Sequence, residues 1–279
     1  MGRKENVMVF QDTEKLCKEN ARLKADVRKS IVSQRLILEL DMVPETDKKK
    51  YDLPAKVIVS RKRSYEAAAA YKDQRVCVHN FASATNPGGG VTHGANAQEE
   101  CLCRCSDLYF CLNTPEMWHG FYKPHRNVRN PIHNDDIIYT PEVVVFKTDT
   151  ANPQLMPEAD WYYVNVITCA APNLREHPSN TYNTGDGNHA IILSEQELKE
   201  IHEKRLRRIL DVASIEENEV VILGAFGCGA FSNDPEVVAQ AARNVIAEYK
   251  HAFKTIEFAV YCRDGEEWNY RVFERGILY

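Results

Sequence analysis

A run of three glycines between an apolar segment and a helical segment constrains this chain more than any other feature. Residues 76–78 are apolar and predict a buried strand, and residues 101–112 predict a helix with Glu99 and Glu100 in its first turn. The glycines, residues 88–90, let backbone approach a ligand where any Cβ would clash, and their amides can form a concave nest for an anion or a sugar hydroxyl. The sequence therefore predicts a site for a polar ligand with two acidic side chains within reach.

The composition is that of an ordinary globular protein. Of the 279 residues, 44% are hydrophobic and 27% are charged, which allows one large domain or two small ones. The net charge is −5 and the pI is about 6.0, so nothing indicates a general affinity for nucleic acid. A polyanionic nucleotide would have to be received by backbone amides and helix N-termini rather than by a basic surface.

No segment predicts membrane insertion or export. No apolar run approaches the roughly 20 residues that span a bilayer, and the first residues lack the apolar stretch of a secretory signal. The nine cysteines are an odd number and lack the spacing of a small disulfide-bonded domain. We therefore expect a reduced, intracellular protein that is cytoplasmic and has no membrane partner.

The first 50 residues differ in pattern from the rest. Residues 12–30 predict one amphipathic helix, with Asp12 or Thr13 as its cap, and residues 33–40 predict a short strand. We expect residues 1–50 to form a helical extension packed on the core.

Strands and helices alternate from residue 51 to the end. Ser194 with Glu197 forms a capping box, and Asp234 caps a helix that has proline at its first position. Pro141 divides residues 137–147, which we expect to form two edge segments. The predicted strands lie at 56–59, 76–78, 137–147, 161–171, 219–223 and 255–261. The predicted helices lie at 64–71, 98–112, 194–212, 234–249 and 266–275.

This alternation favours a mixed or mostly parallel sheet that is covered by helices on both faces. The glycine-rich segments at 88–90 and 224–233 both follow a strand and precede a helix. Loops of that kind open at the same carboxyl edge of the sheet, where ligands bind in such folds. We therefore expect the two segments to meet in one cleft.

The first glycine segment resembles the signature of the bacterial-type poly(ADP-ribose) glycohydrolases, members of the macrodomain superfamily. The shared pattern is Gly-Gly-Gly, seven residues, then Gln-Glu-Glu, and its flanks match at 80–82, 86–87, 102–104 and 108–109. The resemblance implies a three-layer α/β/α macrodomain with a mixed, mostly parallel central sheet. It covers roughly residues 51–279 as the catalytic domain, and the residues before it resemble the N-terminal extension of this family.

The resemblance also implies roles for the residues around the triple glycine. Glu100 would protonate the leaving oxygen, Glu99 would hold ribose hydroxyls, and Gln98 would bind substrate. A simpler alternative is that acids in a first helical turn only stabilise the helix dipole. The other implied substrate-binding residues here are Asn86, Gly88, Gly89, Gly90 and Val91. The simpler alternative for Asn86 is a turn residue before a proline, and the simpler alternative for Val91 is a side chain that fills core space.

The second glycine segment has neither the G-x-G-x-x-G order of a dinucleotide-binding fold nor a P-loop lysine. It resembles the diphosphate loop of macrodomains. By that resemblance, Phe231 would pack against a ribose, and the pyrophosphate would be bound by the amides of Gly227, Cys228, Gly229 and Ala230. The alternative is a tight turn between strand and helix near a core phenylalanine.

The function implied is hydrolysis of the ribose–ribose O-glycosidic bond of poly(ADP-ribose) from chain ends, with release of ADP-ribose and without a cofactor or metal. The substrate would be the polymer or an ADP-ribosylated protein. Two alternatives stay open: a hydrolase of the same fold that removes single ADP-ribose groups, and a module that binds ADP-ribose without cleaving it. A general acid needs a raised pKa, so desolvation and the neighbouring Glu99 charge must outweigh the helix N-terminus.

Three further features carry weaker predictions. Four cysteines between residues 101 and 111 invite a zinc interpretation, but C-x-C-x-C on a helix favours small buried hydrophobes, with Cys103 pointing away from the face of its neighbours. The loop at 172–189 is either a lid or a surface excursion. We expect surface positions for His119, His125 and His133.

Overall fold

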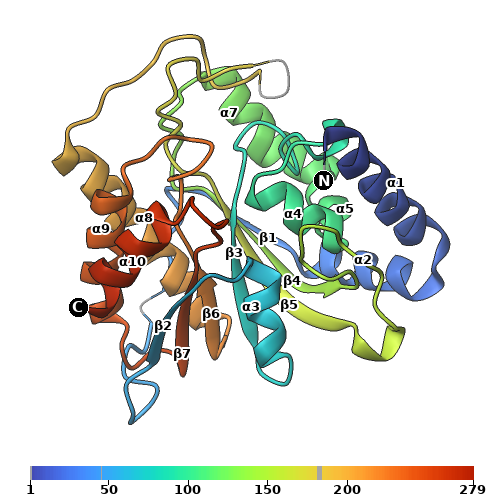
Figure 1. The fold of residues 1–279 in the computed structure, drawn as a ribbon, viewed down its shortest axis with the longest axis horizontal. Coiled ribbons are helices and arrows are strands. Elements are labelled where there is room, and N and C mark those ends of the chain that lie inside the picture. The colour runs from blue at the N-terminus through green and yellow to red at the C-terminus, as the bar shows by residue number, and fades with distance from the viewer. Residues whose placement is uncertain (1, 45, 181–183) are drawn as a thin grey trace.

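The computed structural model describes residues 2–44, 46–180 and 184–279 and contains one seven-stranded sheet (Figure 1). The strand order is β1-β4-β5-β3-β6-β7-β2. Strands β5, β3, β6, β7 and β2 run parallel, whereas β1 and β4 are antiparallel to their neighbours. This confirms the predicted mixed, mostly parallel sheet. The strands are β1 (Arg35–Ile37), β2 (Lys56–Ser60), β3 (Val76–Phe81), β4 (Ile137–Val145), β5 (Tyr162–Cys169), β6 (Val220–Leu223) and β7 (Thr255–Ala259).

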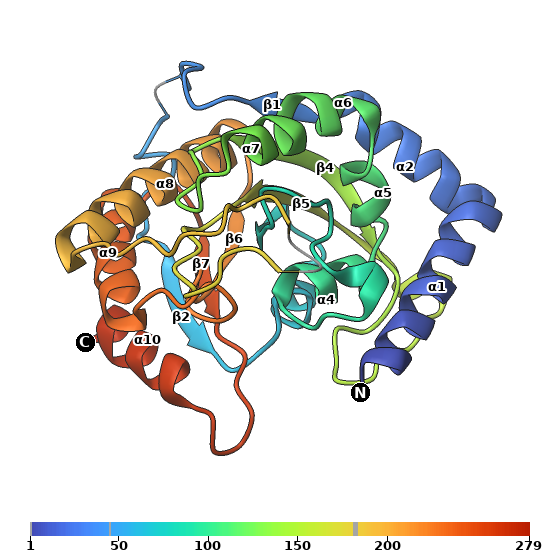
Figure 2. The ribbon, with the colours of Figure 1, turned by 90° about the horizontal axis from the view of Figure 1, so that it is seen from above.

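Helices cover both faces of the sheet, which gives the three layers (Figures 1 and 2). Helices α8, α9 and α10 pack on one face, and α3, α4 and α5 pack on the other. The α-helices are α1 (Arg3–Glu19), α2 (Ala21–Ser33), α3 (Ser64–Ala68), α4 (Gln98–Cys105), α5 (Leu108–Leu112), α6 (Pro115–Met117), α7 (Lys123–Val128), α8 (Glu195–Ile215), α9 (Pro235–Glu248) and α10 (Trp268–Leu278). Of the helices in the described ranges, none has the length and apolar character needed to cross a membrane.

Each central strand supplies both hydrophobic cores because successive side chains point to opposite faces. Cys77 and Val221 belong to the core under α8 and α9, whereas Val78 and Ile222 belong to the core under α3 and α4. All four side chains are almost completely buried. The strands were therefore recognisable as continuous apolar runs rather than as alternating patterns.

The predicted single helix at 12–30 is wrong, because two helices occupy this part of the chain. Asn20 separates α1 from α2, and its side-chain oxygen accepts a hydrogen bond from the amide of Leu23 at 3.1 Å. An asparagine in this role caps a new helix instead of continuing the old one. Thr13 is not a cap but is buried, and its hydroxyl donates to the carbonyl of Arg104 at 2.6 Å.

The predicted strand near residue 35 is confirmed in a shorter form as β1, which pairs with β4 at the edge of the sheet. The helix before it, α2, packs along β4, and α1 packs against α4. Residues 1–50 thus contribute a strand to the central sheet itself. The division of the chain at residue 50 stays a prediction.

The predicted continuous helix through residue 112 is also wrong. Helix α4 ends at Cys105, and α5 begins at Leu108. Between them the hydroxyl of Ser106 donates to the carbonyl of Leu102 at 2.9 Å, and the carboxylate of Asp107 accepts from the amide of Val144 at 2.9 Å. These bonds tie the break to β4, a contact between distant segments that helical periodicity does not reveal.

Pro141 does not divide its segment into two edge pieces, as the sequence had led us to expect. Strand β4 is continuous and lies between β1 and β5, with a register shift between Thr140 and Val143. At such a bulge the ladder needs no donor from the proline. The amide of Glu142, the next residue, donates to the side chain of Asn165 at 3.0 Å.

A buried ion pair joins α8 to the loop before β4. The guanidinium of Arg205 donates from Nε to Asp135 at 2.9 Å, and from its two other nitrogens to the carbonyls of Ala170 at 2.8 Å and Ile132 at 2.7 Å. Arg205 and Asp135 are 2% and 4% exposed, so water solvates neither charge and each depends on its protein partners.

We expect Arg205→Met to lower the free energy of unfolding by about 3–5 kcal/mol, because it leaves the Asp135 carboxylate buried without its main partner. Lys204 contacts the same carboxylate but is largely exposed. Lys204→Met should therefore cost less than about 1 kcal/mol. Denaturant unfolding of both variants measures the difference, and equal losses would contradict this account of the pair.

Candidate active site

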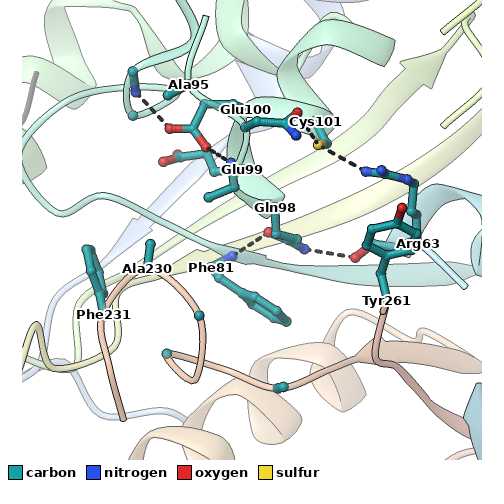
Figure 3. A pocket seen from close by; sticks show the side chains of 18 of the residues that line it. Arg63, Phe81, Ala95, Gln98, Glu99, Glu100, Cys101, Ala230, Phe231 and Tyr261 are labelled. Carbon is teal, nitrogen blue, oxygen red and sulfur yellow. Dashed lines mark hydrogen bonds between the residues drawn. The ribbon is translucent and has the colours of Figure 1, made fainter. Parts of the chain in front are cut away.

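A cavity of about 1060 Å³ opens at the carboxyl edge of the parallel strands (Figure 3). Its walls come from the two glycine segments, the first turn of α4, the loop after β5 and the segment after β7. The predicted meeting of the two glycine segments in one cleft is therefore confirmed. The start of α1 also reaches the cavity.

Glu99 is held inside the cavity wall by β3 and the segment that follows it. Its carboxylate accepts a hydrogen bond from the side-chain amide of Asn80 at 3.2 Å and another from the backbone amide of Ser83 at 2.8 Å. The residue is 2% exposed. Two donors and almost no contact with water hold this side chain in one position at the cavity wall.

Glu100 contacts the triple glycine directly. One carboxylate oxygen accepts from the amide of Gly90 at 2.9 Å, and the other accepts from the amide of Ala97 at 2.9 Å (Figure 3). The second bond closes the first turn of α4, because the side chain reaches back to the residue that precedes the helix. The same carboxylate thus caps the helix and faces the cavity.

Gly89 leaves the space that the two carboxylates need. Its φ is +57°, and a Cβ at this position would lie 2.5 Å from Oε1 of Glu100 and 3.2 Å from Oε2 of Glu99. Both the left-handed backbone and the lack of room therefore require glycine. The packing of Gly89 against Glu99 and Glu100 explains why the Gly-Gly-Gly and Gln-Glu-Glu motifs occur together.

Burial raises the pKa of Glu99 from its ordinary value of 4.5 to about 8, and the charge of Glu100 acts in the same direction. The hydrogen bonds from Ser83 and Asn80 oppose the rise but do not cancel it. Around neutral pH the unliganded cavity therefore holds a proton on Glu99, so the pair of carboxyls carries less negative charge than two exposed acids.

We expect Glu99→Gln to change how stability depends on pH. The folded protein binds a proton at Glu99 that the unfolded chain releases above pH 4.5, so the free energy of unfolding falls as pH rises from about 4.5 to about 8. Relative to wild type, the variant should gain up to about 4 kcal/mol between pH 5 and pH 8.5.

Thermal unfolding of both proteins across this pH range measures that gain. Burial also raises the pKa of Asp107 to about 8, but Asp107 is the same in both proteins and cancels in the difference. A stability difference that stays constant with pH would show that Glu99 is ionised in the fold throughout.

The other predicted residues of the first segment occupy different places. Gln98 lines the cavity, but its amide group is engaged with the backbone of β3 and with Ser64: it accepts from Phe81 at 2.9 Å and donates to the carbonyl of His79 at 2.8 Å. Val91 is completely buried in the core under α4, as the simpler alternative has it.

Gly88 and Asn86 lie behind the cavity wall rather than in it. Gly88 has a φ of +67°, and a Cβ there would lie 2.7 Å from the ring of Tyr109. The carbonyl of Asn86 accepts from the amide of Gly89 at 3.0 Å, and its side chain reaches Thr85 Oγ1 at 3.4 Å. Both residues shape the turn that presents Gly89 and Gly90.

The second glycine segment forms the opposite wall. Gly227, Gly229, Ala230 and Phe231 line the cavity, and a Cβ at Gly229 would meet nothing within 4 Å. Cys228 lies behind them, and its amide already donates to the carbonyl of Ala225 at 3.1 Å.

Phe231 is positioned by groups from two other segments. The guanidinium of Arg175 lies 5.7 Å from the centre of its ring, and the ring of His133 lies 6.0 Å from it. The carbonyl of Phe231 accepts from the amide of Leu174 at 2.9 Å. Distant parts of the chain thus hold the aromatic face at one end of the cavity.

Sequence reasoning missed several residues of the wall. The guanidinium of Arg63 lies 3.9 Å from the centre of the Tyr261 ring and donates to the thiol of Cys101 at 3.3 Å (Figure 3). Arg3 and Asn6, from the first turns of α1, lie beside the segment before α4, where Asn6 donates to the carbonyl of Gly94 at 3.0 Å. No local motif surrounds these residues, so only the fold reveals them.

The predicted surface positions of two histidines are wrong. His119 is exposed, but His125 and His133 are each 8% exposed. Nδ1 of His133 donates to the carbonyl of Ala171 at 2.8 Å, and its other ring nitrogen lies 3.2 Å from the buried carboxylate of Asp186. Polar residues in a proline-containing segment suggested a solvated loop, whereas His133 binds this segment to the loop after β5.

Part of the described 172–189 loop is packed against the body of the protein, and the rest is partly or fully exposed. Asn173 and Asp186 are buried and bonded to each other at 2.7 Å, and Arg175 and Asn180 line the cavity. Residues 181–183 of this predicted lid or surface excursion lie outside the described residues. The loop therefore contributes to the cavity wall through its described residues.

All four cysteines between residues 101 and 111 are buried and carry free thiols. Cys103, which we expected to point away from the face of Cys101 and Cys105, is buried as well, because α4 is buried on every side, and it packs in the same core as Cys105. Within the described ranges, no three His, Cys, Asp or Glu side chains are grouped so as to hold a metal ion. The cysteines act as the small hydrophobes that the spacing favours.

The comparisons with known proteins agree with this geometry. The family model described as "Microbial-type PARG, catalytic domain" matches residues 4–148, which includes the N-terminal helices that we had placed outside the catalytic domain. No curated protein sequence matches the chain significantly.

Solved structures match over nearly the whole chain. The poly(ADP-ribose) glycohydrolase of Thermomonospora curvata is 26% identical, with 98% of this chain and 99% of that chain covered and a TM-score of 0.84; its complex with the inhibitor ADP-HPD covers the same shares at 26% identity and a TM-score of 0.79. The enzyme of Deinococcus radiodurans in complex with ADP-ribose is 28% identical, with 90% and 97% covered and a TM-score of 0.73. This chain belongs to the microbial-type PARG catalytic domain family.

Proposed function

We propose that this protein hydrolyses poly(ADP-ribose), cleaving the ribose–ribose O-glycosidic bond from chain ends and releasing ADP-ribose. The observation that carries the proposal is the contact of Gly89 with Glu99 and Glu100: two buried carboxylates face one cavity beside backbone that has no side chain to fill it. The relatives that are named poly(ADP-ribose) glycohydrolases, one of them in complex with ADP-ribose, support the choice of ligand.

The ligand fits the cavity by its chemistry. The amides of Gly229 and Ala230 at the rim of the second segment would receive the diphosphate, and Phe231 would pack against the distal ribose. Glu99 would accept hydrogen bonds from ribose hydroxyls near the bond to be cleaved. At the other end, the ring of Tyr261 offers an aromatic surface to the adenine.

Glu100 would act as the general acid. In the substrate complex, ribose hydroxyls that donate to Glu99 would favour its charged form, so the proton that the pair holds would lie on Glu100. Its proton passes to the leaving 2′-oxygen of the next unit as the bond between that oxygen and the distal C1″ breaks. The electron pair of the broken bond stays with the leaving oxygen, which leaves an oxocarbenium-like ribose. A water molecule then forms the new bond to C1″ and returns a proton to Glu100, so the carboxyl group is regenerated.

Two other functions fit the same fold. A hydrolase of single ADP-ribose groups would use the same carboxylates on a different leaving group, and a binding module would use only the cavity. The intact pair of buried acids favours catalysis over binding alone, because a binding module has no need of a proton donor at Glu100.

Substrate comparison tests the proposal. Purified protein is incubated in parallel with a poly(ADP-ribosyl)ated and a mono-ADP-ribosylated acceptor, and free ADP-ribose is measured by chromatography. We expect release from the polymer, with the last protein-linked unit left in place. Release from the mono-ADP-ribosylated acceptor alone would favour the first alternative, and tight ADP-ribose binding without release from either acceptor would favour the second.

A further inference from the structure

A second groove, of about 700 Å³, is lined by residues of α7, by the turn before it and by Thr184 and Gly185. Trp118 and His119 line it from the π-helical turn Trp118–Tyr122, and Gly185 lines it from the opposite loop. Three further cations, Lys123, Arg126 and Arg129, complete its basic wall. None of the described residues that line it is acidic.

Gly185 links this groove to the first glycine segment. A Cβ on Gly185 would lie 2.5 Å from Cγ2 of Thr85 on one side and 2.8 Å from Cγ of Arg126 on the other. Thr85 precedes Asn86 in the turn that presents Gly89 to the two carboxylates. Gly185 therefore packs against both the basic wall and the segment that leads to the triple glycine.

Trp118 is linked to the same loop by a second route. Its indole nitrogen donates to the side chain of Asn113 at 2.7 Å, and Asn113 donates to the hydroxyl of Tyr109 at 3.1 Å. The ring of Tyr109 packs against Gly88, where a Cβ would lie 2.7 Å from it. The indole is thus held in a fixed position relative to the triple glycine.

The charges of the groove are unusual for this chain, which has a net charge of −5. The ion pairs found between described residues do not include Lys123, Arg126 or Arg129. The guanidinium of Arg126 lies 5.6 Å from the centre of the Trp118 ring and donates to the hydroxyl of Thr184 at 2.7 Å. Three cations beside an indole suit a ligand that combines a diphosphate with a purine.

We propose that this groove binds the second ADP-ribose unit of a poly(ADP-ribose) chain while the terminal unit occupies the catalytic cavity. The inference rests on the proposed function and names its substrate more closely as a polymer. The diphosphate of the second unit lies against Lys123, Arg126 and Arg129, and its adenine lies beside Trp118. The groove thereby favours polymer over a single ADP-ribose group and attracts a polyanion to a protein of negative net charge.

The test compares two double charge reversals in a Glu100→Gln background, which removes turnover from the measurement. Lys123→Glu with Arg126→Glu changes the groove. Lys24→Glu with Arg28→Glu makes the same change of charge on the exposed face of α2. Affinity is measured by calorimetry for ADP-ribose and for a size-fractionated poly(ADP-ribose), at two salt concentrations.

We expect the groove variant to bind polymer about tenfold more weakly than its parent at low salt, with a salt dependence reduced by about one to two in log–log slope. Its affinity for ADP-ribose should stay within about twofold of the parent. The α2 variant should change neither affinity by more than about twofold. The neutral double variant, Lys123→Gln with Arg126→Gln, should also lose polymer affinity, but by a smaller factor. It serves as the test if the charge reversals prevent folding.

Four results would overturn the proposal: equal polymer affinity in groove and α2 variants, an equal loss for ADP-ribose and polymer, no polymer binding by the parent, or oligo(A) RNA of the same charge bound as tightly as polymer. The last result would make the groove a general polyanion site. Because binding is measured without turnover, failure of the groove and failure of wild type to hydrolyse polymer are separate results.

Discussion

Glu100→Gln is expected to lower kcat on poly(ADP-ribose) by at least about 10³-fold, while the Kd for ADP-ribose stays within a few fold of wild type. Glutamine has almost the same shape as glutamate but has no ionisable proton to give to the leaving oxygen. The cavity itself should be preserved, because Gly89 tolerates the side chain that is already in contact with it. Single-turnover assays and calorimetry measure the two quantities.

The cap that Glu100 provides needs its own control. Its carboxylate accepts from the amides of Gly90 and Ala97, and glutamine offers only one acceptor for the two. Glu197→Gln makes the same change in the capping box at the start of α8, where Glu197 accepts from the amide of Ser194 at 2.8 Å. Both variants should lose some stability, and only Glu100→Gln should lose activity. Normal turnover by Glu100→Gln would end its assignment as the acid.

Gly89→Val is expected to abolish measurable ADP-ribose binding, with a Kd raised at least about 100-fold. At a φ of +57° the new Cβ would lie 2.5 Å from Oε1 of Glu100, so the carboxylates must move or the turn must open. The branched side chain would also occupy the part of the cavity between them. Gly89→Ala should show the same effect in a weaker form, which calorimetry can rank.

Gly265→Ala separates backbone strain from loss of space. Gly265 has a φ of +84°, but a Cβ there would meet nothing within 4 Å. This variant should lose roughly 1 kcal/mol of stability from strain and keep its ADP-ribose affinity. Unchanged affinity in Gly89→Val would mean that the triple glycine serves only the turn.

Local sequence patterns predicted those elements whose ends are determined by residues close to them in the sequence. Ser194 and Glu197 cap α8 as their spacing indicates, and Asp234 with its following proline begins α9. The glycine segments meet because parallel strands bring their carboxyl ends to one edge, a rule that needs only the order of elements. The same rule placed Glu99 and Glu100 at the cavity.

The errors have causes that lie far away in the sequence. The break after Cys105 is tied to β4, and the bulge at Pro141 lies in the pairing of β4 with β5, where Asn165 accepts from the amide of Glu142. The burial of His133 depends on Asp186, which belongs to another loop. Periodicity reports which face of an element is apolar, but it does not report which distant partner satisfies a polar group.

The same reason explains what the sequence left out of the site. Arg63, Tyr261 and Arg3 reach the cavity from three separate segments, and none of them lies in a motif. Gln98 is the opposite case: it lies within the motif, but its side-chain amide is hydrogen-bonded to the backbone of β3. Motif residues thus include those that build the wall as well as those that face a ligand.

The most direct test of the account is the release of free ADP-ribose from an automodified poly(ADP-ribose) acceptor. Purified wild-type protein and Glu100→Gln are incubated side by side, and the product is identified by chromatography. The account predicts ADP-ribose from wild type and none above background from the variant. Equal release by both proteins, or no release by wild type under conditions in which it binds ADP-ribose, would contradict it.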